Sequence, residues 1–245
     1  MKFLLDGPTQ RIKRKENNPI VAGQLLTPLT GYSNWGGAFA VDNGAFSRFN
    51  QGKFLRLLER ERDNVGRCLF VAMPDIVGSG RRTLEIWQRR QMFNVPECFP
   101  LAFVAQDGVE DLEVPWGEFS ALFIGGCDPW KDSKAACDLV KTAKMLGIHV
   151  HIGRVNQPER YERFAALGAD TCDGSGISRE MGGDRQFRNI STRLNEPSLF
   201  DQGRTLVCQV CGSHEISLGT TSDPEDVCTD CGCVVITSCG SENTV

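Results

Sequence analysis

Short apolar runs recur along the first 175 residues of the chain, and most of them end in a polar residue or a glycine. Apolar runs of this length, bounded by turn-forming residues, predict buried β-strands. A further run at residues 19–26 predicts one more strand. The other six occupy residues 39–42, 69–75, 101–106, 121–126, 149–153 and 169–173.

The segments between these runs carry apolar residues at helical spacing. Residues 51–65 place Phe54, Leu57 and Leu58 near one face, and residues 130–146 show the same periodicity. A third such segment ends at Gly168, a residue that commonly terminates helices. Strand and helix therefore alternate from about residue 39 to residue 175, which indicates a parallel sheet with helical crossovers.

Two architectures fit this alternation, an open doubly wound sheet and a closed barrel. An open sheet concentrates its site at one switch point, whereas here nearly every run ends in a polar or glycine residue. The carboxyl ends of all barrel strands converge on one face, where side chains for binding and catalysis collect. We therefore predict an α/β fold, a (β/α)₈ TIM-like barrel over residues 1–203.

Length and composition are those of an ordinary globular protein. The 245 residues are 40% hydrophobic and 24% charged, and no 18-residue apolar run or signal-peptide pattern occurs. We therefore expect a cytoplasmic protein, in the host cytoplasm if the chain is viral, without a membrane partner. The net charge of −4 is uneven, because residues 201–245 carry −6 and the first 200 residues about +2.

The cysteines near the C-terminus form two Cys-x-x-Cys pairs that are separated by sixteen residues. Four thiolates at this spacing predict a tetrahedral Zn²⁺ site, which would be structural because it leaves no open coordination position. The predicted ligands are Cys208, Cys211, Cys228 and Cys231. We therefore expect a zinc ribbon at residues 204–245, whose acidic surface contacts either nucleic acid or a protein partner.

The residues at the strand ends predict the chemistry of the barrel mouth. Two carboxylates on opposite sides of a sugar, such as Asp42 and Asp173, can carry out double-displacement glycosyl chemistry. An Asp can accept hydrogen bonds from the N1–H and amino groups of a purine, and a Gln can donate to its O6. Asp75 and Gln106 are the candidates for these contacts, with a backbone N–H of the pair Gly125-Gly126 as a further donor.

The motifs that contain these residues, taken in order, resemble the tRNA-guanine transglycosylase superfamily. The closest resemblance is to the branch of deazapurine DNA-modification enzymes in bacteria and their viruses. The match covers roughly residues 20–176. Its motifs are Val41-Asp-Asn-Gly-Ala-Phe46, Pro74-Asp75, Val104-Ala-Gln-Asp-Gly108, Phe123-Ile-Gly-Gly126, His151-Ile-Gly-Arg154 and Asp170-Thr-Cys-Asp173.

The resemblance implies an enzyme that exchanges guanine for a 7-deazaguanine without breaking the nucleic acid backbone. It implies that Asp173 is the nucleophile of a covalent Asp–sugar intermediate and that Asp42 handles protons. Asp75, Gln106 and the backbone of Gly125 and Gly126 would then hold the purine. Asn43, Gly44, Gly153 and Arg154 belong to the same motifs and are further candidates for substrate binding.

Two departures from the tRNA enzymes favour DNA as the substrate. Residues 42–47 read Asp-Asn-Gly-Ala-Phe-Ser where the tRNA enzymes usually have Asp-Ser-Gly-Gly-Phe-Gln, and the cysteines form two knuckles instead of three cysteines and a histidine. Three alternatives stay open: base exchange on tRNA, a metabolic barrel that binds phosphate at Gly174-Ser-Gly176, and a non-catalytic nucleic-acid adaptor. We interpret His149 and His151 as core or pocket packing rather than as metal ligands.

Overall fold

The computed structural model describes residues 1–8, 17–174, 216–217 and 227–228. The chain divides into two units, Met1–Thr192 and Arg193–Val245. The domain boundary that we expect near residue 203 lies outside the described residues.

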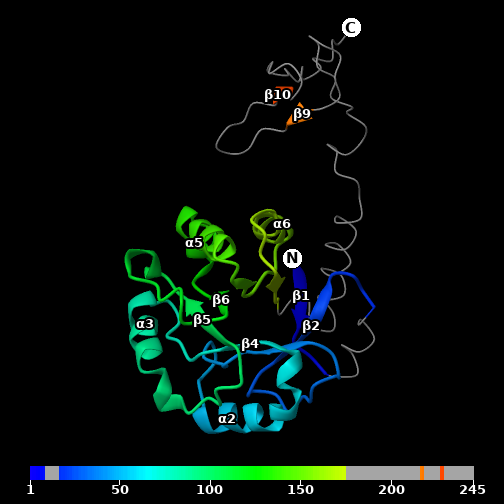
Figure 1. Ribbon diagram of the computed structural model, residues 1–245. Helices are drawn as coiled ribbons and strands as arrows, with labels where there is room; N and C mark the ends of the chain where they lie inside the picture. The colour runs from blue at the N-terminus through cyan, green and yellow to red at the C-terminus, as the bar shows by residue number, and fades with distance from the viewer. Residues whose placement is uncertain (9–16, 175–215, 218–226, 229–245) are drawn as a thin grey trace. The chain divides into compact units, whose positions relative to one another are not determined.

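The first unit contains eight strands that close into a barrel in sequence order, with every neighbouring pair parallel (Figure 1). The structure thus confirms the predicted TIM-like barrel, and each of the seven apolar runs contains a strand. The strands are β1 (Lys2–Leu5), β2 (Val21–Leu26), β3 (Phe39–Val41), β4 (Cys68–Ala72), β5 (Leu101–Ala105), β6 (Ala121–Ile124), β7 (His149–Ile152) and β8 (Thr171–Cys172).

Strand β1 is the one that the sequence pattern did not indicate. Its four residues are too few to show a period, yet they complete the barrel by pairing with β2 on one side and β8 on the other. Phe3 lies opposite both Val21 and Cys172 and is fully buried. The N-terminal segment is therefore part of the barrel wall.

The described helices lie between β3 and β8, with at least one helical segment after each strand from β3 to β7 (Figure 1). The segment 51–65 is helical only to Arg60 and continues as a 3₁₀ turn, and the segment 130–146 is divided at Ser133, whose hydroxyl caps the second helix. The bounds are α2 (Gln51–Arg60), η1 (Arg62–Arg67), α3 (Gly80–Gln88), η2 (Arg90–Phe93), η3 (Val109–Asp111), α4 (Asp128–Lys131), α5 (Lys134–Met145) and α6 (Pro158–Ala166).

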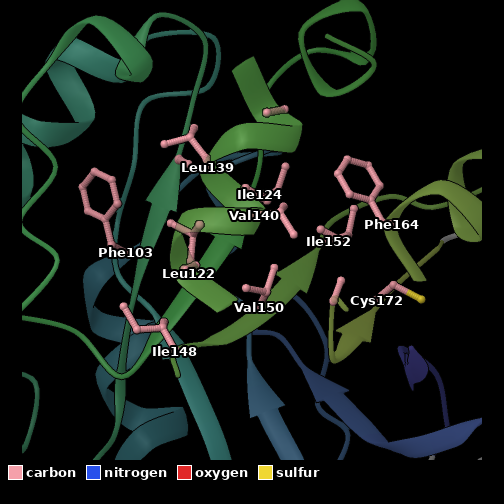
Figure 2. Packing of buried hydrophobic residues seen from close by; sticks show 14 of the residues in the cluster. Phe103, Leu122, Ile124, Leu139, Val140, Ile148, Val150, Ile152, Phe164 and Cys172 are labelled. Carbon is pink, nitrogen blue, oxygen red and sulfur yellow. The ribbon is translucent and has the colours of Figure 1, made fainter. Parts of the chain in front are cut away.

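Alternating strand residues divide the core into an inner and an outer layer. Leu122 and Ile124 of β6 and Val150 and Ile152 of β7 point outward and pack against α5 and Phe164 of α6 (Figure 2). Residues of the opposite parity fill the barrel interior, including Phe70, Val104 and Phe123. The barrel is thus a packed core that leaves space for a ligand only at its ends.

The described part of the second unit is a pair of antiparallel strands, β9 (Ile216–Ser217) and β10 (Val227–Cys228). Cys228 is the last residue of β10, while Cys208, Cys211 and Cys231 lie outside the described residues. None of the helices in the described part of the chain has the length and apolar character that crossing a bilayer requires.

Candidate active site at the carboxyl end of the barrel

A cavity opens at the carboxyl end of the barrel, and nearly all of the predicted site residues line it. The space between its walls, including the open mouth, is about 510 Å³. The lining residues are Asp42, Asn43, Phe46, Ala72, Asp75, Val77, Val104, Gln106, Phe123, Gly125, Gly153, Arg154 and Asp173. Of the barrel residues predicted from the sequence, only Gly44 and Gly126 are not part of this lining.

Asp42 directly follows β3 and is held by the turn after it. Its amide donates to the Leu26 carbonyl at 2.8 Å, which extends the β2–β3 ladder by one residue. Its Oδ1 accepts a hydrogen bond from the Gly44 amide at 2.5 Å. Gly44 has φ +77°, a conformation that favours glycine, so this residue type allows the turn that closes on the carboxylate.

Asp173 directly follows β8, and each of its carboxylate oxygens lies within hydrogen-bond distance of a nitrogen. Oδ1 accepts from the Arg154 backbone amide at 3.1 Å, and Oδ2 lies 3.0 Å from Nε2 of His151. Its side chain is 14% exposed, so it can contact a ligand in the cavity. Asp170, the neighbouring acid, instead accepts from Lys144 of α5 and the Val150 amide, as strand alternation predicts.

The acids of the cavity affect one another's protonation. Burial raises the pKa of Asp42 to about 7, the Gly44 hydrogen bond opposes this shift, and the charges of Asp173, Asp75 and Asp6 add to it. Asp6 follows β1 and was missed together with that strand. Its pKa is also raised, first by burial and then by Asp173.

Asp75 is the centre of a buried hydrogen-bond network. Its Oδ1 accepts from Nδ2 of Asn43 at 2.8 Å, and its Oδ2 accepts from Nε2 of Gln106 at 2.6 Å. The Asn43 amide group also donates to the Met73 carbonyl, which links the ends of β3 and β4. Burial raises the pKa of Asp75, while the two amide donors oppose that shift. Each carboxylate oxygen keeps a lone pair for a ligand.

Gly125 and Gly126 are positioned differently from their predicted role. The Gly125 amide donates to the Ala105 carbonyl at 2.9 Å, and the Gly126 amide donates to Oε1 of Gln106 at 3.0 Å. Both amides thus already have acceptors within the protein. A Cβ at Gly125 would lie 2.5 Å from Nε2 of Gln106. The lack of a side chain at Gly125 therefore makes room for the amide of Gln106.

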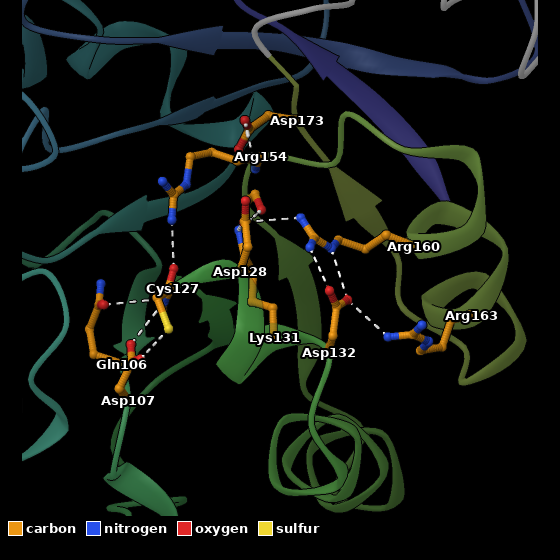
Figure 3. A network of polar contacts seen from close by, with 12 residues as sticks. Gln106, Asp107, Cys127, Asp128, Lys131, Asp132, Arg154, Arg160, Arg163 and Asp173 are labelled. Carbon is orange, nitrogen blue, oxygen red and sulfur yellow. Dashed lines mark hydrogen bonds and ion pairs between the residues drawn. The ribbon is translucent and has the colours of Figure 1, made fainter.

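Arg154 closes one side of the cavity in a backbone conformation that is uncommon outside glycine. Its φ is +57°, which places its amide against Asp173. Its guanidinium, drawn in Figure 3, donates to the Gly126 carbonyl at 2.6 Å. The same group lies 4.5 Å from the centre of the Phe46 ring. Phe46 is 66% exposed, so the cavity rim presents an aromatic face beside a cation.

Charged side chains of α4 and α6 hold the segment that follows β7 in place. Nζ of the buried Lys131 donates to the Gly153 carbonyl at 3.0 Å, and burial lowers the pKa of Lys131 to about 8. Arg160 of α6 forms ion pairs with Asp128 and Asp132 (Figure 3). These contacts tie α4 and α6 to the segment that carries Arg154.

Thr171, like Asp6, is a site residue that the sequence reasoning missed, and His151, which it interpreted as core or pocket packing, contacts Asp173 directly. His151 is fully buried, and its ring lies between Asp173 and the hydroxyl of Thr171, which is 2.9 Å from Nδ1. The signal that could have identified Thr171 and His151 is strand alternation, because residues 149 and 151 share one face of β7, residues 171 and 173 share one face at β8, and His151 pairs with Thr171. Among the described residues, no group of three or more His, Cys, Asp or Glu side chains is arranged to hold a metal ion.

The arrangement brings the hydrogen-bonded carboxylate of Asp173, the Asp42 carboxyl group with a pKa of about 7, and the Asp75–Gln106 pair to one cavity. Carboxyl groups in such settings can in general act as nucleophiles or exchange protons, and amide–carboxylate pairs can hydrogen-bond polar ligands. A scan against protein-family models finds no match for the chain, and a search of curated proteins finds no similar sequence either.

Proposed function

We propose that the protein is a base-exchange glycosyltransferase that replaces guanine in DNA with a 7-deazaguanine derivative. The observation that carries this proposal is that Asp42 and Asp173 line one cavity. Asp75 and Gln106, which are hydrogen-bonded to each other, line the same cavity. An acid of raised pKa beside a hydrogen-bonded carboxylate fits a two-step displacement at a sugar carbon.

In the first step Asp173 attacks C1′ of the target nucleotide. An Asp173–C1′ ester bond forms as the bond between C1′ and N9 breaks, and the bonding electrons leave with the guanine. A protonated Asp42 supplies the proton for N9, since a pKa of about 7 leaves a substantial protonated fraction at neutral pH.

In the second step the incoming deazaguanine takes the place of guanine. The ionised Asp42 accepts the N9 proton, N9 attacks C1′, and the ester electrons return to Asp173. Two inversions at C1′ give net retention, and both carboxylates end in their starting states.

Asp75 is the group best placed to recognise the base. Its carboxylate can accept from the N1–H and the exocyclic amine of a guanine, while Asn43 and Gln106 hold it in one orientation. Gln106 has a second Nε2 hydrogen for the O6 of the base. Its Oε1 is occupied by the Gly78 and Gly126 amides at 2.9 and 3.0 Å, which fixes the amide orientation.

A nucleotide must leave its base stack to reach this cavity. The exposed ring of Phe46 offers a stacking face for a base at the rim, and Arg154 beside it carries a positive charge. DNA is preferred over tRNA because of the sequence departures at residues 42–47 and in the cysteine pattern.

We also propose that Cys208, Cys211, Cys228 and Cys231 bind one structural Zn²⁺, with the acidic ribbon available to a protein or nucleic acid partner. The support is their spacing and the chemistry of four thiolates. Elemental analysis of the purified chain should give one zinc per molecule, and Cys208→Ser with Cys211→Ser should lose it.

The test of the function is incubation of the full chain with isotopically labelled guanine and either DNA or tRNA, followed by mass spectrometry of the nucleosides. We expect label in DNA, and none with the Asp173→Ala variant. Label in tRNA alone would overturn the choice of DNA, and label in neither polymer would contradict base exchange. Nucleic acid binding without exchange would instead support the adaptor alternative. The phosphate-binding alternative depends on residues 174–176, of which only Gly174 is described.

A further inference from the structure

A column of polar side chains runs through the barrel interior to the proposed nucleophile. It begins at His149, the first residue of β7, and continues through Thr171 and His151 to Asp173. Nε2 of His149 and Nδ1 of His151 each lie 2.9 Å from the Thr171 hydroxyl oxygen, and Nε2 of His151 lies 3.0 Å from Oδ2 of Asp173.

The surroundings of this column are apolar, so its hydrogen bonds have few competitors. The His151 ring lies 4.6 Å from the Phe123 ring centre and 5.0 Å from that of Phe70. Burial lowers the pKa of the half-buried His149 to about 4, although the Asp170 carboxylate opposes this shift. A neutral His149 has one N–H and one lone pair to offer.

The single hydroxyl hydrogen of Thr171 restricts the possible arrangements. If Thr171 donates to His149, His151 must use Nδ1–H toward Thr171, and a neutral His151 then turns a lone pair toward Asp173. Two acceptors would face each other at 3.0 Å in a buried site, which is unfavourable for an ionised Asp173. In the other arrangement, Nε2–H of His149 donates to Thr171, Thr171 donates to Nδ1 of His151, and Nε2–H of His151 donates to Asp173.

We propose that Thr171, held by His149, donates to Nδ1 of His151 and so directs its Nε2–H at Asp173, which makes His151 the positioning residue of the Asp173 carboxylate. The Nε2–H donor holds one carboxylate oxygen of Asp173, and the Arg154 amide holds the other, so the orientation of the carboxylate is fixed on both sides. The role of this positioning in catalysis rests on the proposed function, but the tautomer does not.

The direct test is ¹⁵N NMR of the imidazole rings in the full chain, which contains three histidines. Signals are assigned from the His149→Phe and His214→Gln variants. We expect the cross-peak pattern of a neutral Nε2–H imidazole for His151 at pH 7. A doubly protonated ring or the Nδ1–H tautomer would overturn the proposal.

Thr171→Val and Thr171→Ser form the matched pair for the relay. Valine keeps the shape and the strand preference but removes the hydroxyl, so we expect a mixture of His151 tautomers, while serine keeps the wild-type pattern. Formation of the Asp173 adduct should slow about twofold to tenfold in the valine variant, the effect of losing one ordinary hydrogen bond that orients the His151 ring. Serine should restore most of the rate.

The outcomes for the relay and for the function are distinguishable. An unchanged His151 spectrum in Thr171→Val would show that Thr171 does not select the tautomer, and that result contradicts the relay whether or not exchange occurs. Absence of adduct from the wild-type chain would contradict base exchange, while the NMR pattern would still decide the tautomer.

Discussion

The surroundings of Asp42 shift the pKa of its carboxyl group far from the value of a free aspartic acid. The cavity removes water from the carboxylate, and three further acids surround it, so the pKa rises to about 7 in spite of the Gly44 amide. An acid of this pKa can give and take a proton at neutral pH, which is what the two steps of base exchange require of one residue.

The raised pKa of Asp42 predicts a pH-dependent cost in stability. Because the folded state retains this proton up to about pH 7 while the unfolded state releases it near pH 4, stability falls as the pH rises between these values. Asp42→Asn removes the charge and keeps an oxygen for the Gly44 amide. We expect the variant to exceed the wild type by roughly 2–4 kcal/mol at pH 8 in urea unfolding.

The control for Asp42 is the same comparison near pH 4, where both proteins are uncharged at this position and the difference should be small. A constant difference between pH 4 and pH 8 would show that Asp42 does not titrate in this window.

Phe46 should contribute to nucleic acid binding but not to folding. Its ring is 66% exposed, so Phe46→Ala should change the unfolding free energy by less than about 0.5 kcal/mol. Loss of one base-stacking face should weaken binding of single-stranded DNA by about 1–3 kcal/mol, measured by fluorescence anisotropy. Met145→Ala is the control, since Met145 is 81% exposed and does not line the cavity. Equal affinities in the two variants would exclude Phe46 from the binding surface.

At the scale of elements, the sequence predicted which strand ends meet, because alternation of apolar and polar residues is a local property. It did not predict what the polar groups bind there. The acceptors of the Gly125 and Gly126 amides, and the contact between His151 and Asp173, depend on the register of adjacent strands. That register is set by packing across the whole barrel and is not visible in one segment.

Gly125 tests the packing of one strand end against the next. A Cβ there would lie 2.5 Å from Nε2 of Gln106 and 3.0 Å from the Val104 side chain, so Gly125→Ala must displace the amide that holds Asp75. We expect a loss of about 1–3 kcal/mol in unfolding free energy and weaker binding of free guanine in calorimetry.

Gly117→Ala is the matched control, because a Cβ at that position has no neighbour within 4 Å. If Gly125→Ala binds guanine as tightly as the wild type, Gln106 does not take part in recognition of the base.

At the scale of the whole molecule, closure of the barrel depends on the four residues of β1, which join the first and last strands. Phe3 is fully buried and stacks on Tyr161 of α6 with ring centres 5.3 Å apart. Phe3→Ala should therefore cost about 3–5 kcal/mol in urea unfolding, and the exposed Lys2→Ala should cost little. Equal stability of the two variants would mean that β1 is not essential to the barrel.

The most direct measurement of the central claim is the site of covalent attachment to the sugar. The full chain is incubated with a guanine-containing DNA strand, denatured, digested with protease and nuclease, and its peptides are mapped by tandem mass spectrometry. The account predicts a deoxyribose ester on Asp173, absent from the Asp173→Asn variant. An ester on any other residue, or the same yield of adduct from that variant, would contradict it.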